Sequence, residues 1–149
     1  MTQLSRKAKY ALRALYALAR QGTARPTRAE DLAAGEDIPR KFLESILLEL
    51  THAGMLESRR GKGGGYVLGR RPEEIAVGDV IRLIDGPLAP VPCLLADGGR
   101  CEGCAGNAAC GTRRVMARVA GAVAAILDAT TIADASAEAW LSVSSKLDG

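Results

Sequence analysis

Apolar residues recur at helical spacing through the first third of the chain. Over residues 4–20 they return every three or four positions, which predicts a helix with one buried face. A shorter helix is predicted over about residues 28–34, where Thr27 and Glu30 have the spacing of a capping box. After a short turn, a third helix is predicted over residues 39–52, with a proline at its first position.

The third predicted helix separates its apolar residues from its polar ones. At about 100° per residue, its apolar side collects Phe42, Leu43, Ile46, Leu47 and Leu50. The other side is polar, with Leu48 among its members, and Arg40 and Lys41 lie at the amino-terminal tip. Two short helices joined by a tight turn, the second with a basic tip, predict a helix-turn-helix over about residues 28–52.

A glycine-rich segment follows, flanked by two short apolar stretches. This pattern predicts a two-stranded hairpin over residues 55–69, with Arg59, Arg60 and Lys62 at or near its tip. A nucleotide phosphate loop is excluded because Gly63 follows Lys62 where that motif needs Ser or Thr. A basic hairpin directly after a helix-turn-helix is a wing, which contacts phosphates or the minor groove.

The remaining helices are predicted at residues 78–85, at 112–128, and from 130 through Trp140 and Leu141. The long helix over 112–128 has a broad apolar stripe, which favours a symmetric dimer interface over burial within the protein's own core. The stripe consists of Val115, Met116, Val119, Ala122, Val123, Ile126 and Leu127.

Together these elements predict a mainly α protein with a small β wing. We expect a winged helix-turn-helix domain over residues 1–72, a connecting helix and linker over 73–92, a loop over 93–110, and a dimerisation helix with a terminal helix over 111–149. Aromatic residues make up only 3% of the chain, which also favours helices over sheets. No apolar run is long enough to span a membrane and the first 20 residues are interrupted by basic side chains, so we expect a cytoplasmic protein.

Charge is distributed unevenly along the chain. Residues 1–72 contain 14 Lys and Arg against seven Asp and Glu, a balance of +7, whereas residues 73–149 carry −4. A basic half joined to an acidic half suggests a polyanionic partner for the first half, although ordinary solvated surface can have the same balance.

All four cysteines, Cys93, Cys101, Cys104 and Cys110, lie in the predicted loop. In the cytosol thiols stay reduced, so a metal or iron–sulfur site is favoured over disulfides, which remain the alternative. Four cysteines fill both irons of a [2Fe–2S] cluster or all corners of a [4Fe–4S] cluster. A Zn²⁺ site is equally allowed by ligand type, but only Cys101 and Cys104 form the C-x-x-C pair that zinc ribbons repeat.

Several segments of the chain resemble the Rrf2 family of bacterial transcription regulators, of the IscR and NsrR type. They are residues 4–12, 38–46 and 50–58, the wing sequence RGKGGGYVL at 60–68, and residues 77–81 with Asp85 and Gly86. The resemblance covers about residues 1–132. It implies a winged helix-turn-helix joined to a long dimerisation helix, with an iron–sulfur cluster held between them in many members.

The resemblance also implies a set of cluster ligands. Cys93, Cys104 and Cys110 match the three cysteines of the family, and Cys101 is an addition. IscR-like members add a histidine shortly after the last cysteine, where this chain has Arg113. NsrR-like members use an acidic residue near the amino terminus, where residues 7–9 offer none. Cys101 is therefore the expected fourth ligand.

We therefore expect a homodimeric regulator that binds a pseudo-palindromic site in double-stranded DNA under the control of an iron–sulfur cluster or of thiol redox state. The alternative is a regulator with a structural zinc or a disulfide switch in the same loop. An enzyme is not expected, because the chain has one histidine, no G-x-S-x-G and no paired-acid motif. The expected DNA-binding residues are Arg28, Arg40, Lys41, Glu44, Ser45, Arg59, Arg60, Lys62 and Gly64.

Overall fold

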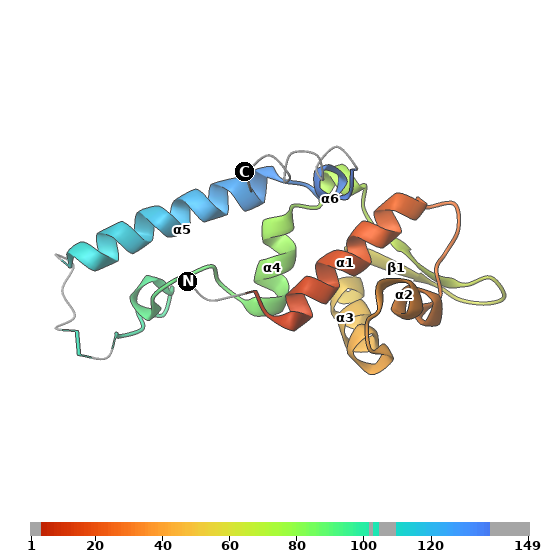
Figure 1. Ribbon diagram of the computed structural model, residues 1–149, viewed down its shortest axis with the longest axis horizontal. Coiled ribbons are helices and arrows are strands. Elements are labelled where there is room, and N and C mark those ends of the chain that lie inside the picture. The colour runs from red at the N-terminus through yellow and green to blue at the C-terminus, as the bar shows by residue number, and fades with distance from the viewer. Residues whose placement is uncertain (1–3, 102, 105–109, 138–149) are drawn as a thin grey trace.

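Helix α1 (Arg6–Gln21) lies at the centre of the protein, as the computed structural model shows for residues 4–101, 103–104 and 110–137 (Figure 1). It packs against α2 (Ala29–Glu36), α3 (Arg40–His52), α4 (Val77–Asp85), α6 (Ile132–Ser136) and strand β2 (Gly65–Leu68). Alanines at four of its seven buried positions let these neighbours approach closely. The predicted cap at Ser5 is confirmed, because the Ala8 amide donates to Ser5 Oγ at 3.0 Å.

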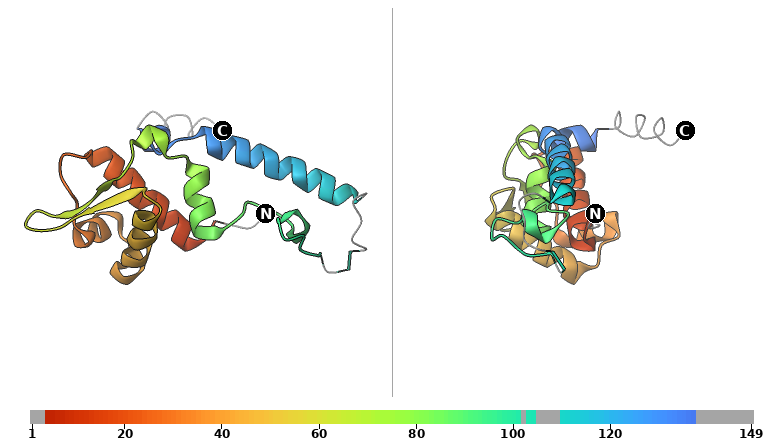
Figure 2. Two further views of the ribbon diagram at one scale, coloured as in Figure 1. Left: turned by 180° about the vertical axis from the view of Figure 1, so that it is seen from behind. Right: turned by 90° about the vertical axis from the view of Figure 1, so that its left-hand side faces the viewer.

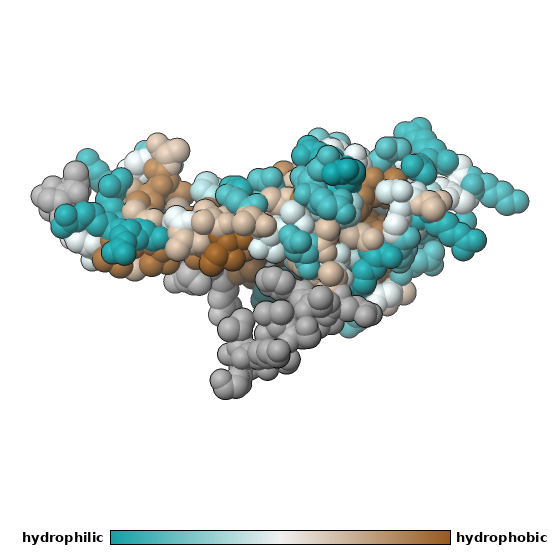
Figure 3. Space-filling model, turned by 90° about the horizontal axis from the view of Figure 1, so that it is seen from above, coloured by the Kyte–Doolittle hydropathy of each residue, from teal (hydrophilic) through white to brown (hydrophobic). Residues whose placement is uncertain are grey.

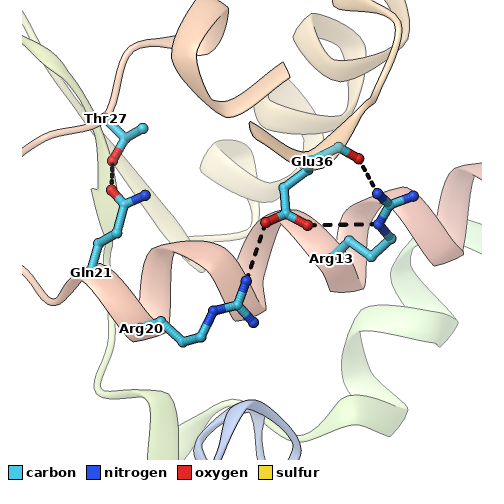
Figure 4. A network of polar contacts seen from close by, with 5 residues as sticks. All are labelled: Arg13, Arg20, Gln21, Thr27 and Glu36. Carbon is cyan, nitrogen blue, oxygen red and sulfur yellow. Dashed lines mark hydrogen bonds and ion pairs between the residues drawn. The ribbon is translucent and has the colours of Figure 1, made fainter. Parts of the chain in front are cut away.

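The carboxyl end of α2 is fixed to α1 by ion pairs. Glu36 accepts from Arg20 at 3.2 Å and lies 3.7 Å from Arg13 Nε, and Arg13 also donates to the Glu36 carbonyl (Figure 4). The Arg13 guanidinium thus satisfies a terminal carbonyl that the helix itself leaves without a partner. Asp37 then turns the chain in the left-handed region, at φ 51°, and Ile38 enters the core.

Thr27 joins the wing to the helix-turn-helix instead of capping α2. Its backbone pairs with Tyr66 of β2, at 3.0 and 2.8 Å, and its hydroxyl hydrogen-bonds the Gln21 side chain (Figure 4). The predicted capping box of Thr27 and Glu30 is therefore wrong: Arg28 is the N-cap and makes no side-chain cap bond. The pairing with the wing, a tertiary contact, overrides the local capping pattern.

The wing is an antiparallel hairpin of β1 (Leu56–Arg59) and β2, with Leu56 opposite Leu68 and Arg59 opposite Gly65. Gly65 has φ +151°, and a Cβ there would overlap the Thr27 carbonyl and lie 2.9 Å from the Arg28 nitrogen. Only glycine fits this close approach between the wing and the start of α2.

The segments after the wing and after α5 (Gly111–Ala129) pair and close the core. Ala76, between the 3₁₀ turn η1 (Pro72–Glu74) and α4, bridges to Thr131, and the Ile132 amide donates to the Ile75 carbonyl at 2.9 Å. Both isoleucines are buried, at 1% and 0% exposure. The carboxyl end of α5 is thereby anchored to the winged-helix body.

The rest of α5 extends away from that body as an arm, at the end of the molecule opposite the wing (Figures 1 and 2). The short turn η2 (Pro92–Leu94) lies beside its amino-terminal end, where Arg113 Nε donates to the Cys93 carbonyl at 3.4 Å. No residue of α5 is buried in the chain. The arm is therefore held at its base and has a large exposed surface.

The predicted fold class is confirmed, since the described elements are helices with one small antiparallel sheet. Helix α3 begins at Arg40, with Pro39 as its N-cap, and α5 is one residue longer at each end than predicted. The last helix reaches only Ser136, and Trp140 and Leu141 lie outside the described residues. Among the helices that are described, none is long and apolar enough to cross a membrane.

Gly65→Ala is expected to lower the free energy of unfolding by roughly 1–3 kcal/mol, because the new methyl group meets backbone atoms of residues 27 and 28. Gly35→Ala is the matched control. Gly35 lies in α2 with no atom near its missing Cβ, so alanine there is neutral or stabilising by up to about 1 kcal/mol. Urea unfolding of both variants measures the difference, and equal stabilities would contradict the close contact between wing and α2.

Candidate nucleic-acid interface and cysteine centre

The outward face of α3 holds Lys41, Glu44 and Ser45, all exposed, while Leu43, Ile46, Leu47 and Leu50 are fully buried on the other side. This division agrees with the predicted recognition helix except at Phe42. That ring is 42% exposed and packs edge-on against Tyr10, with ring centroids 5.8 Å apart. It therefore lies at the margin of the core.

Arg40 is already engaged by two carboxylates. Its guanidinium lies 2.7 Å from Glu30 of α2 and 3.0 Å from Glu44 one turn along α3. The hydrogen bond with Glu44, followed by the charge of Glu30, raises the pKa of Arg40, although its ordinary value already keeps it charged. Sequence reasoning missed Glu30, because nothing in the sequence indicates that α2 and α3 bring these two residues together.

The other basic side chains of the predicted interface are exposed and form fewer ion pairs than Arg40. Within the described chain, Arg28, Lys41, Arg60 and Lys62 form no ion pair or hydrogen bond, whereas Arg59 lies 3.5 Å from Glu57. The pairing of Thr27 with Tyr66 brings Arg28 next to the wing. The start of α2 and the wing therefore present neighbouring cations, as nucleic-acid binding requires.

Gly64 has a steric role in the wing tip. A Cβ on Gly64 would overlap the Arg59 carbonyl and lie 2.9 Å from the Gly61 carbonyl, which accepts from the Gly64 amide at 2.9 Å. The tight turn this permits carries Lys62 at its apex.

The four cysteines lie near the free, amino-terminal end of α5, in two pairs. Cys93, in η2, lies close enough to Cys101 for that thiol to help raise the pKa of Cys93, and Cys104 likewise helps to lower the pKa of Cys110, the N-cap of α5. The Cys104 amide donates to the Cys101 carbonyl at 3.1 Å, which links the two pairs. None of the four is in a disulfide.

The two ends of this cysteine centre differ electrostatically. Backbone hydrogen bonds from the first turn of α5, that of Arg113 foremost, lower the pKa of the Cys110 thiol. Partial burial, and then the hydrogen bond with Cys101, raise the pKa of Cys93. The amino terminus of α5 thus favours a thiolate at Cys110.

The positions of the thiols can be compared with what each kind of metal centre requires. Among residues 4–101, 103–104 and 110–137, no three His, Cys, Asp or Glu side chains converge on a point that could hold one metal ion. Two thiol pairs fit a two-iron cluster, in which each iron takes two thiolates. A single tetrahedral zinc would need all four thiolates around one point.

Part of the apolar stripe of α5 faces a cavity beside α4, and part of it is exposed. Val119, Val123 and Leu127 line a cavity of about 500 Å³ with Ile81 of α4 and residues 86–90. Val115 and Ile126 point elsewhere and are 53% and 65% exposed. Figure 3 shows hydrophobic surface over the half of the molecule that contains α5. Hydrophilic surface dominates the half that contains the wing.

Helix α4 connects this arm to the winged-helix body through contacts that sequence reasoning did not predict. Arg82 bridges Asp79 and Asp128 of α5 at 2.9 and 2.6 Å, and a Cβ on Gly78 would overlap the Asp128 carboxylate. Asp85 accepts from the Ser5 amide at 2.9 Å, at the start of α1. The i,i+3 spacing of Asp79 and Arg82 could have predicted their ion pair from the sequence. Asp128 is too far along the chain for its pairing with Arg82 to be predicted in this way.

Comparison with known proteins gives consistent results. The Rrf2 family, described as iron-dependent transcriptional regulators, matches residues 4–138. An rrf2-like HTH-type transcriptional regulator of Rhodobacter capsulatus is 38% identical over 135 residues, covering 88% of this chain and 90% of the relative.

Two solved structures are similar across most of the chain. CymR, the global cysteine regulator of Bacillus subtilis, is 33% identical with a TM-score of 0.75, covering 91% of this chain and 97% of CymR. IscR of T. potens is 28% identical with a TM-score of 0.69, covering 89% and 85% of the two chains.

The fold and these similarities define a DNA-binding regulator of transcription, not an enzyme. The chain belongs to the Rrf2 family. The family resemblance drawn from the sequence is thereby confirmed, and so is the expectation that the protein is not an enzyme, since its relatives are named transcriptional regulators.

Lys62→Ala is expected to weaken binding to all DNA sequences alike and to reduce the slope of log K against log [salt] by about one unit, because one phosphate contact is lost. Lys9→Ala removes the same charge from the exposed amino-terminal part of α1 and should leave the slope unchanged. Fluorescence anisotropy over a salt series measures both. Equal slopes for Lys62→Ala and the wild type would contradict the wing's role.

Proposed function

We propose that this regulator is a homodimer whose affinity for a pseudo-palindromic operator is set by a [2Fe–2S] cluster on Cys93, Cys101, Cys104 and Cys110. The observation that carries the proposal is the grouping of all four thiols at the amino-terminal end of α5, where the Cys104 amide donates to the Cys101 carbonyl, Cys93 lies beside Cys101, and Cys104 lies beside Cys110. A change in the oxidation state of a bound cluster, or its loss, would then act as the signal that changes operator affinity. The regulator would act on DNA in the cytoplasm.

The ligand set is supported by chemistry as well as by spacing. Iron–sulfur clusters are held by thiolates, and the start of α5 favours the ionised form of Cys110. Arg113, which contacts the Cys93 carbonyl, adds positive charge beside an anionic cluster. Cys101 takes the place of the histidine or acid used by other family members, which gives each thiol pair one iron.

The dimer is supported by the exposed stripe of α5. Val115, Ala122 and Ile126 fall within about 40° of one another around the helix and are all exposed in the protomer. A second copy of α5 laid against this stripe would bury it in both protomers. It would also place two recognition helices on one side of the dimer, as a pseudo-palindrome requires.

Control of DNA binding by the cluster follows from the position of the cysteine centre on the arm. The cysteines lie at the free end of α5, whereas the base of α5 is tied to α4 through Arg82 and Asp128. A change in the order of the loop would shift α5 against its partner and, through α4, the spacing of the two recognition helices. Such a coupling is expected to be about 1–3 kcal/mol, or roughly 5–150-fold in operator affinity.

A thiol switch without metal is the second candidate, and the same pairing supports it. The relative CymR is described as a global cysteine regulator. An oxidant that removes two electrons and two protons from each pair would give Cys93–Cys101 and Cys104–Cys110 disulfides. The two candidates differ in whether metal-free, reduced protein binds the operator as the holoprotein does.

For the cysteine centre, we expect Cys93→Ala, Cys104→Ala and Cys110→Ala to abolish cluster binding, and Cys101→Ala to leave a weaker or spectrally shifted cluster that water or an external thiol completes. Anaerobic absorption spectra with iron and sulfide counts measure this. Two irons and two sulfides per protomer are expected. A colourless protein with one bound zinc would contradict the proposal.

Operator affinity of the anaerobic holoprotein, the apo-reduced and the apo-oxidised protein separates the two candidates. A difference between holo and apo-reduced protein supports the cluster as the sensor. A difference that arises only on oxidation, with Cys93–Cys101 found by mass spectrometry, supports the thiol switch. Equal affinity of all three forms would leave a DNA-binding protein with a structural loop.

For the dimer, Val115→Glu combined with Ile126→Glu is expected to give a monomer, because the interface would bury four carboxylates without partners. Loss of the second recognition helix should weaken operator binding by roughly 10²–10⁴-fold. Ala117→Glu is the control, because it lies about 160° around the helix from Val115 and is exposed. Sedimentation velocity measures the oligomeric state, and a dimeric double variant would refute this interface.

A further inference from the structure

Leu48 lies near the middle of the surface that α3 turns away from the core. At about 100° per residue, it is within about 30° of the direction opposite to the centre of the four buried residues. Its side chain is 55% exposed, more than any other large apolar side chain of the winged-helix body. Ser45 and His52, one turn before and after it, are also exposed.

This exposure differs from that of the other large apolar residues. Phe42 is packed against Tyr10, while Val115 and Ile126 belong to a continuous stripe suited to another helix. Leu48 is a single apolar side chain among polar ones, since Lys41, Glu44, Ser45 and His52 surround it on the helix face. A protein partner would need a wider apolar patch. A single apolar group on a DNA-facing helix matches one feature of the major groove, the C5-methyl group of thymine.

The neighbouring contacts strengthen this assignment. Arg40 is held by Glu30 and Glu44, which leaves fewer polar side chains on this face available to read bases. Leu48 lies about 10 Å further along the helix axis than Lys41, so the two side chains approach different base pairs. Apolar contact at Leu48 would therefore add a sequence requirement that the basic residues do not supply.

We propose that Leu48 contacts the C5-methyl group of a thymine in each half-site and so makes thymine the preferred base at one position of the operator. The contact removes water from both the leucine side chain and the methyl group. Burial of one methyl group gives a preference of roughly three- to five-fold per half-site. A dimer on a symmetric operator applies this preference twice.

The experiment replaces thymine by deoxyuridine, which has the same hydrogen-bonding groups but no methyl. An operator is first selected from random DNA with the full-length anaerobic protein, and each thymine is then replaced in turn. Wild-type affinity is expected to fall by roughly three- to five-fold at one position per half-site. Leu48→Ala should bind the thymine and deoxyuridine forms equally at that position. Leu48→Met, which keeps an apolar side chain of similar size, should retain the preference.

Leu83→Ala is the matched control, because Leu83 is an exposed leucine on α4, outside the recognition helix, and its loss should leave the preference intact. Thermal unfolding checks that each variant is folded. The proposal is overturned if the wild type shows no such position, or if Leu48→Ala discriminates thymine from deoxyuridine as the wild type does. Failure of the wild-type protein to select any operator is a separate result, which would count against sequence-specific binding altogether.

Discussion

Helix α5 carries an apolar surface that the protomer leaves uncovered, and much of the molecule is arranged around that fact. The helix has 19 residues, none of them buried, yet its base is fixed by Ile132 in the core and by Asp128 against Arg82. Covering the apolar side of such an arm removes apolar surface from water, which is energetically favourable. In the proposed homodimer, a second copy would cover this side and would also set the distance between the two recognition helices. The cysteine centre lies at the opposite end of the same arm.

Helix α4 is the junction between the arm and the winged-helix body. Asp85 binds the start of α1, Arg82 binds Asp128 of α5, and Gly78 leaves the space that the Asp128 carboxylate occupies. The Arg82–Asp128 ion pair is partly exposed and of small net energy, so it adjusts more easily than a packed core. An ion pair of this kind can hold α5 in one orientation and, in the proposed homodimer, could still adjust when the loop or the partner changes. The body around α1 would move with α4 as a unit, because Val80 and Ile81 of α4 are buried in the same core.

On the predicted DNA-binding surface, some basic side chains form no ion pair with the residues that the structure describes, whereas Arg40 is paired with two carboxylates. Four basic residues are exposed, and as predicted DNA contacts they would bind phosphates, which gives affinity without sequence preference: Arg28, Lys41, Arg60 and Lys62. Arg40 is held by Glu30 and Glu44, and in the proposed complex these carboxylates would reduce the general attraction of the recognition helix for DNA. Base-specific contacts on this face would then contribute a larger share of the difference in affinity between operator and non-operator DNA. An exposed Leu48 at the centre of such a face is consistent with that balance.

The sequence determined the elements, because the spacing of apolar residues reports which face of a helix is buried. It indicated α1 with its Ser5 cap, the polar side of α3, the glycine-rich wing and the clustering of four cysteines. It failed where contacts between distant segments decide the outcome. The backbone of Thr27 pairs with Tyr66, so the predicted capping box does not form. Glu30 of α2 forms an ion pair with Arg40 of α3. Asp128 binds Arg82, which is 46 residues away in the sequence. The partition of the cysteines into two pairs, and their position at the free end of α5, were likewise decided by the tertiary structure. Local patterns fix local conformation, whereas these contacts depend on how the helices pack, which no short stretch of sequence records.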